Sequence, residues 1–159
     1  MKIEVWELID KSSLGTGTFE YEKFKINIAE INDGIIKETY NAKSYFYYTC
    51  PYNQIREWNV FIWRVYLMLR FYTGNLLLPQ TKIIIDEYDN FKIIFEGFKN
   101  FGEARSVFME GRNNFSNFLE TSFEIFNEKW EIYNLLFTYW ITLNNHSFFI
   151  DTARFSLIL

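Results

Sequence analysis

Hydrophobic and polar residues alternate with a period of two over the first fifty residues of the chain. Ile3, Val5 and Ile9 fall on one parity, and Trp6 and Leu8 fall on the other. Because side chains alternate across a strand, this first strand is expected to carry apolar groups on parts of both faces. Further strands are predicted over 19–28, with a bulge or a break near 22–23, over 35–40, and over 44–49.

Two glycine-containing segments interrupt the strand pattern. Asp33-Gly34 is the strongest turn signal in the chain, because Asp-Gly supplies the positive φ that a tight hairpin demands. It predicts a hairpin turn that leads into the 35–40 strand. Gly15-Thr16-Gly17 predicts a turn or flexible loop, and it lacks the later glycine and the Lys-Ser/Thr of a phosphate-binding loop.

The hydrophobic period changes to that of a helix after Pro51. Apolar residues at Ile55, Trp58, Val65 and Leu69 predict an amphipathic helix over 53–73. A strand-turn-strand hairpin is predicted next, over 82–98, with its turn at 87–90. The segment 98–109 fits either a loop or a short strand.

A second helical period follows Gly111 and predicts a helix over 113–143, capped by Asn113 or Asn114. A polar break at 144–146 then separates it from a short last helix that runs to Leu159. The expected apolar stripe of the long helix includes Phe115, Phe118, Leu119, Ile125, Phe126, Ile132, Tyr133, Leu136, Trp140 and Leu143. The expected solvated face carries Glu120, Glu124, Glu128 and Glu131.

These elements together predict an α+β protein. Antiparallel strands in the N-terminal third and a central hairpin are expected to pack with two long amphipathic helices and a short C-terminal helix. The predicted division is an α+β domain over 1–110 and a helical part over 111–159 that packs on it.

Composition narrows the class of protein. Apolar residues make up 49 % and charged residues 23 % of the 159 residues, which excludes disordered, collagen-like and coiled-coil chains. Aromatic residues are unusually frequent at 21 %, and the net charge of −4 does not favour a polyelectrolyte partner. The sequence shows neither a signal peptide nor a run of about 18 apolar residues long enough to span a membrane. A cytoplasmic protein without membrane association is expected.

Catalytic residues are scarce. The single cysteine and single histidine exclude a disulfide framework and a Cys/His-rich zinc site. His146 lies in a polar Asn-Asn-His-Ser stretch typical of a solvated loop, and Cys50 at a strand-to-helix junction is expected to be a small core residue. No G-x-S-x-G motif is present. We predict no catalytic residue, and the balance of these observations is against an enzyme.

Metal and nucleic-acid sites have weak support. Asp86, Glu87 and Asp89, with Glu96 on the returning strand, could hold a hard cation, but hairpin turns are normally acidic for solubility. No metal or cofactor is predicted. Arginines interleave with aromatic residues on the 53–73 helix, as in single-strand binders, yet they do not form one stripe, and most of these aromatics are expected in the core. These residues are Arg56, Arg64, Arg70, Trp58, Trp63 and Tyr66.

Two segments resemble a known family. The segment from Trp58 to Gly74 resembles the helix with a terminal Thr-Gly turn in the N-terminal domains of ApeA-like abortive-infection proteins. The segment 115–159 resembles the next part of those proteins, a long helix and then an acid-x-x-R-F element, here Asp151, Arg154 and Phe155. In such proteins this last helix opens a C-terminal HEPN ribonuclease domain.

The resemblance implies no nuclease activity for this chain. HEPN ribonucleases use an R-x(4–6)-H motif, and the positions 139–141 that would supply the arginine before His146 hold Tyr, Trp and Ile. A histidine matching Arg154 would lie beyond Leu159. The resemblance therefore implies a non-enzymatic sensor or protein-binding module.

The partner is expected to be another protein or a second copy of the chain. The expected contact residues are Phe148, Phe149, Arg154, Phe155, Leu157 and Leu159, because apolar side chains crowd this segment and aromatics are enriched in interface cores. The alternative function is a small enzyme or a single-stranded nucleic-acid binder with a dispersed carboxylate or Arg/Tyr site.

Overall fold

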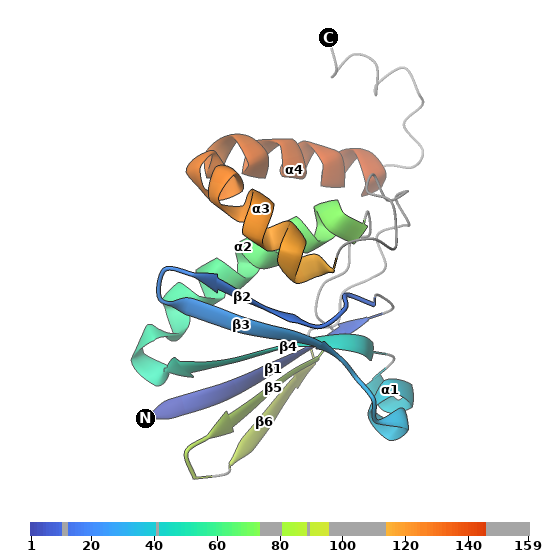
Figure 1. Cartoon of the computed structure of the whole chain (residues 1–159), viewed down its shortest axis with the longest axis vertical. Coiled ribbons are helices and arrows are strands. Elements are labelled where there is room, and N and C mark those ends of the chain that lie inside the picture. Colours follow the sequence, from blue (N-terminus) through green and yellow to red (C-terminus); the bar gives the residue numbers. More distant parts are fainter. Residues whose placement is uncertain (11–12, 41, 74–80, 89, 96–113, 146–159) are drawn as a thin grey trace.

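The computed structural model of the chain describes residues 1–10, 13–40, 42–73, 81–88, 90–95 and 114–145. Its centre is a six-stranded antiparallel sheet with the order β2-β3-β4-β1-β5-β6 (Figure 1). The strands are β1 (Lys2–Asp10), β2 (Gly17–Tyr21), β3 (Phe24–Glu30), β4 (Ala42–Pro51), β5 (Thr81–Asp86) and β6 (Phe91–Phe95).

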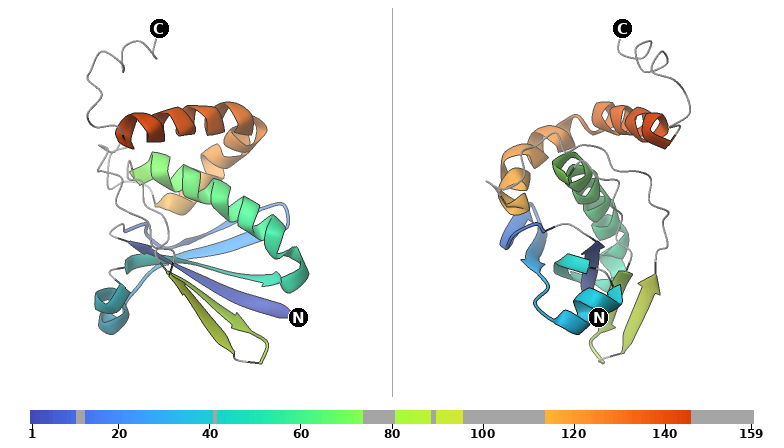
Figure 2. Two further views of the ribbon diagram at one scale, coloured as in Figure 1. Left: turned by 180° about the vertical axis from the view of Figure 1, so that it is seen from behind. Right: turned by 90° about the vertical axis from the view of Figure 1, so that its right-hand side faces the viewer.

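The structure describes four α-helices, and the three longer ones lie on one side of this sheet (Figure 1). The helices are α1 (Gly34–Tyr40), α2 (Ile55–Thr73), which follows the 3₁₀ turn η1 (Tyr52–Gln54), α3 (Phe115–Glu128) and α4 (Trp130–Asn145). The two views in Figure 2 show α2 and α3 above the sheet and α4 above them, while α1 lies at one end of the strands. The structure confirms the α+β fold predicted from the sequence.

The core lies between the sheet and helices α2 and α3. Val5 on β1 and Phe46 on β4 are fully buried beneath the helices, and Val65 and Phe115 meet them from above. On the other face of β1, the Trp6 ring packs between two tyrosines of β4, with ring centroids 5.0 Å from Tyr45 and 4.5 Å from Tyr47. The expectation of apolar groups on both faces of the first strand is confirmed.

The prediction of a strand over 35–40 is wrong, because this segment forms α1. The Oδ1 of Asp33 accepts a hydrogen bond from the Ile36 N–H at 2.9 Å, and its carbonyl accepts one from Lys37 at 3.1 Å. Asp-Gly therefore starts a helix here instead of turning a hairpin. The position beside β3 that a strand over 35–40 would fill is taken by β4, in the register Asn27 to Tyr47.

The long C-terminal helix predicted over 113–143 is two helices that meet at Lys129. Asn114 caps α3 as expected, because its side chain accepts from the Asn117 N–H at 3.1 Å. Because of this break, only part of the predicted apolar stripe faces the core. Phe115 and Phe126 are buried, whereas Ile132 and Leu136 are exposed. The change of direction lets α3 pack on β2 while α4 crosses above α2 (Figure 1).

The remaining sequence predictions fall into three groups. The break at 22–23 is a two-residue turn that joins β2 to β3, and the hairpin predicted over 82–98 is formed by β5 and β6 as far as Phe95, the last described residue of this segment. The segment 98–109 and the short helix after 146 lie outside the described residues, and the division at residue 110 stays a prediction. None of the described helices has the length and apolar character needed to cross a membrane.

Candidate functional site

Helix α4 carries a row of exposed apolar side chains. Ile132, Leu135, Leu136 and Tyr139 follow the spacing i, i+3, i+4, i+7, which places them on one side of the helix. Each is between 49 % and 61 % exposed. We call these four residues the α4 stripe. An apolar row of this length on the outside of a helix is typical of an interaction surface.

The opposite side of α4 packs inward. The Tyr133 ring lies 5.2 Å from Phe126 and 6.5 Å from Phe71, measured between ring centroids. Trp130 lies edge-on to Phe126 and receives the Arg64 guanidinium 4.7 Å from its ring centroid. Because α4 is apolar on two opposite sides, packing on α2 and α3 satisfies only one of them.

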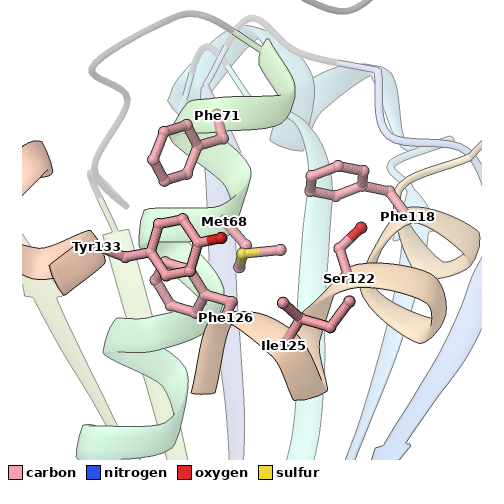
Figure 3. A pocket seen from close by; sticks show the side chains of 7 residues that line it. All are labelled: Met68, Phe71, Phe118, Ser122, Ile125, Phe126 and Tyr133. Carbon is pink, nitrogen blue, oxygen red and sulfur yellow. The ribbon is translucent and has the colours of Figure 1, made fainter. Parts of the chain in front are cut away.

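An apolar pocket opens beside the α4 stripe, between α2, α3 and the first turn of α4. It has a volume of about 310 Å³. Figure 3 shows its lining residues, Met68, Phe71, Phe118, Ser122, Ile125, Phe126 and Tyr133. The Tyr133 hydroxyl and the Ser122 hydroxyl lie among otherwise apolar groups. Ile125 is 55 % exposed at the edge of this helical pocket.

The flank of α3 and α4 is acidic. Glu120, Glu124, Glu128 and Glu131 are all exposed, as the sequence predicted, and Lys129 is the only basic residue between 115 and 145. Of these glutamates, Glu131 lies on α4 itself, next in sequence to Ile132 of the stripe, and the other three lie on α3. A partner that covers the α4 stripe gains from carrying positive charge.

A buried polar cluster lies under α2, and the sequence pattern gave no sign of it. Glu7 on β1 is only 1 % exposed. Its carboxylate accepts hydrogen bonds from the hydroxyls of Tyr48, at 2.7 Å, and Tyr66, and it pairs with Lys82 Nζ at 3.1 Å. A buried carboxylate that is satisfied by three donors fixes the packing of β1, β4, β5 and α2. It offers no free oxygen-rich face for a metal ion.

Cys50 is buried in the core, as the sequence predicted. Burial raises the pKa of its thiol to about 11, and the nearby Lys82 ammonium opposes this shift only in part. The thiol is therefore protonated near neutral pH, which is the unreactive form. His146 lies outside the described residues.

In the acidic β5–β6 hairpin, the Asp86 carboxylate stabilises the turn. Asp86 accepts hydrogen bonds from the backbone N–H groups of Tyr88 and Asn90 and from the Asn90 side chain. The side-chain bond from Asn90 is the main cause that lowers the pKa of Asp86. Asp89 and Glu96 lie outside the described residues, and within the described part no group of three His, Cys, Asp or Glu residues could hold a metal ion.

The aromatic residues of α2 divide between core and surface. Trp58 and Tyr66 are buried, whereas Trp63 is exposed. Of the arginines on this helix, Arg56 is exposed and Arg64 is half-buried against Trp130. The side chain of Arg70 lies outside the described part of the chain.

The contact residues predicted from the sequence, Phe148, Phe149, Arg154, Phe155, Leu157 and Leu159, also lie outside the described residues. The exposed apolar side chains that the structure does describe on α4 were missed, because Ile132 and Leu136 were expected to face the core. Comparison of the chain with protein-family models, with curated proteins and with solved structures finds no match.

Proposed function

We propose that this chain is a non-enzymatic protein-binding or sensor module, of the kind that its resemblance to the N-terminal region of ApeA-like antiviral proteins implies. The observation that carries the proposal is the α4 stripe. Four large apolar side chains at helical spacing stay about half exposed although the helix already packs on the domain. The protonated, buried thiol of Cys50 supports a binding role over a catalytic one.

The occupant that fits the α4 stripe is an amphipathic helix of another protein. Apolar anchors at i, i+3, i+4 and i+7 match the side-chain spacing of a second helix lying along the first. Covering the exposed half of the four side chains contributes about 3–6 kcal/mol before the entropy cost of association. That gain suits a reversible complex.

Charge favours a basic helix. The exposed Glu131 on α4 and the three exposed glutamates of α3 attract a partner helix that carries lysine and arginine. A second copy of α4 would bring no excess of positive charge, since the 115–145 segment has Lys129 as its only basic residue. The segment 146–159 holds one acidic and one basic residue, Asp151 and Arg154, and so is not complementary either.

The test uses the whole chain and a synthetic helical peptide with leucine at i, i+3, i+4 and i+7 and lysine at the bordering positions. Fluorescence anisotropy of the labelled peptide measures the dissociation constant. Leu136→Glu places a charge in the stripe and should weaken binding at least about tenfold. Ile35→Glu on α1, which places the same charge at another exposed aliphatic side chain, should leave the dissociation constant unchanged.

A scrambled peptide of the same composition separates helix recognition from simple charge attraction, and should bind at least about tenfold more weakly. Equal binding of the two peptides, or of wild type and Leu136→Glu, would show that the stripe is not the docking surface. Light scattering of the unliganded chain should give a monomer, and a dimer that Leu136→Glu dissociates would assign the stripe to a second copy instead.

A further inference from the structure

A second pocket lies on the other side of α3, where the β2–β3 turn meets α2. It has a volume of about 390 Å³, within the range of small-molecule sites. Its lining combines aromatic rings with polar and charged groups: Tyr21, Glu22, Lys23, Phe24, Glu57, Val60, Phe61, Arg64, Phe123 and Asn127. We call it the arginine pocket, and among the described residues it shares no lining side chain with the helical pocket.

Arg64 is the cation of this pocket that has no counter-ion among the described residues. Its Nη1 donates to the Oδ1 of Asn127, and its Cζ lies over the Trp130 ring, 4.7 Å from the ring centroid. Its Nε is buried without a hydrogen-bond acceptor, and no carboxylate in the described part of the chain forms an ion pair with it. A half-buried guanidinium with unused donors is costly to keep unless something of opposite charge joins it.

The Tyr21 hydroxyl is a second hydrogen-bond donor of the arginine pocket. Asn127 uses its side-chain oxygen for Arg64 and its Nδ2 to donate to the Tyr21 hydroxyl at 3.0 Å. Because the Tyr21 oxygen accepts from Asn127, its own proton is left to donate, and the described contacts show no acceptor for it. The Asn127 side chain thus orients both the Arg64 guanidinium and the Tyr21 hydroxyl at this pocket.

The other charges of the pocket are largely matched. Lys23 forms an ion pair with Glu57 across the mouth, which leaves Arg64 and the exposed Glu22. Glu22 has a φ of 53°, in the left-handed region that favours glycine. A positive φ is usual in a two-residue hairpin turn such as the one that joins β2 to β3 here.

The aromatic side chains of the arginine pocket indicate the shape of the uncharged part of the ligand. The rings of Phe24 and Phe61 stack at a centroid distance of 4.4 Å, and Phe123 meets Phe61 edge-on at 5.5 Å. Val60 at the mouth is 55 % exposed. Flat aromatic surface beside an unpaired guanidinium is the arrangement that recognises an aromatic oxyanion.

We propose that the arginine pocket binds a small anion with a flat apolar body, its carboxylate or phosphate group on the Arg64 guanidinium and the Tyr21 hydroxyl, and its body against Phe24 and Phe61. This site goes beyond the protein-binding function and rests on different residues. A module with both surfaces would sense a small molecule on one side of α3 and hold a partner helix on α4.

The test titrates the whole chain with phenyl phosphate and with benzoate, and follows tryptophan emission and calorimetric heat. Trp130 lies directly under the guanidinium, so its emission should change on binding, and Trp130→Phe should remove that change while calorimetry still detects binding. Inorganic phosphate and acetate, which lack the apolar body, should bind at least about tenfold more weakly. A preference for phosphate or carboxylate decides which oxyanion the site takes.

Two variants and one control complete the design. Arg64→Met should reduce affinity for phenyl phosphate at least about tenfold, and Arg56→Gln, which removes an exposed arginine of the same helix, should leave it unchanged. Val60→Glu adds a negative charge at the exposed mouth, and it should weaken binding without touching the core even where Arg64→Met fails to fold.

Two results would overturn the proposal. One is the absence of a heat signal with both aromatic anions at millimolar concentration. The other is equal affinity of wild type and Val60→Glu. Either result leaves the helical peptide assay on α4 unaffected, so this site and the proposed function fail separately.

Discussion

Lys82 on β5 places its Nζ 3.1 Å from the Oε1 of Glu7 on β1, and the two residues are direct cross-strand partners. Glu7 is almost fully buried, and the Lys82 side chain is only 13 % exposed. The same ammonium lies 3.3 Å from the Asn59 side chain on α2. One buried ion pair therefore links the centre of the sheet, its β5–β6 hairpin and the helix above them.

Replacing Lys82 with methionine should be strongly destabilising. Lys82→Met keeps most of the apolar stem but leaves the Glu7 carboxylate buried without its cation. Breaking a buried pair from one side costs about 3 kcal/mol or more of the free energy of unfolding. Urea denaturation at pH 7, followed by circular dichroism, measures that loss.

Lys25→Met serves as the control, because Lys25 pairs with Glu20 at the exposed edge of the sheet. An exposed pair contributes at most about 1 kcal/mol. Similar losses in Lys82→Met and Lys25→Met would mean that the Glu7 pair contributes no more than a surface contact.

A second prediction concerns the contact between β2 and α3. A Cβ added at Gly17 would overlap the Ser116 Oγ and lie 2.8 Å from the Ser116 Cβ, so any larger side chain pushes the helix away from the strand. Gly17→Ala should lower the free energy of unfolding by about 2 kcal/mol. Thermal and urea denaturation measure the change.

The double variant Gly17→Ala with Ser116→Gly checks the cause. If the clash is responsible, removing the serine side chain restores part of the loss, and the two effects are far from additive. Simple addition of the two single losses would place the cost of Gly17→Ala elsewhere, for example in the backbone of the strand.

The local sequence pattern predicted the helices and strands of this fold better than it predicted which of them pack or pair with one another. The alternation around Val5 and Trp6 identified β1 and its two apolar faces, because side-chain parity is a property of the strand itself. Asp33-Gly34 was misread because the same two residues suit a hairpin and a helix start. The choice between them depended on β4 occupying the place beside β3, which is a contact distant in sequence.

The candidate sites were less accessible to sequence reasoning for the same reason. Glu7 appeared as one more polar position on a strand, and its partner Lys82 lies on the far hairpin. A continuous helical period placed Leu136 on the buried side, and only the break at Lys129 turns it outward. Arg64 was noted among the arginines of its helix, but its lack of a counter-ion among the described residues is visible only in three dimensions.

The last prediction is a pH dependence set by Cys50. The pKa of its thiol is about 11 in the folded chain, against a value of 9.0 for the free group, because burial opposes the charged thiolate. A raised folded-state pKa means that its contribution to stability is complete below about pH 9 and is lost as pH rises through 11. The loss should reach about 2 kcal/mol at pH 11.

The comparison that isolates this effect is between the wild type and Cys50→Ala, in urea denaturation at pH 7, 9 and 11. The pKa values of Tyr47 and Tyr72 are also raised by burial, but these tyrosines titrate in both proteins and cancel in the difference. Cys50→Ala should be less stable at pH 7, and the gap should narrow by about 2 kcal/mol at pH 11. A constant gap would show that the thiol has the same pKa in the folded and the unfolded chain, and it would contradict the prediction.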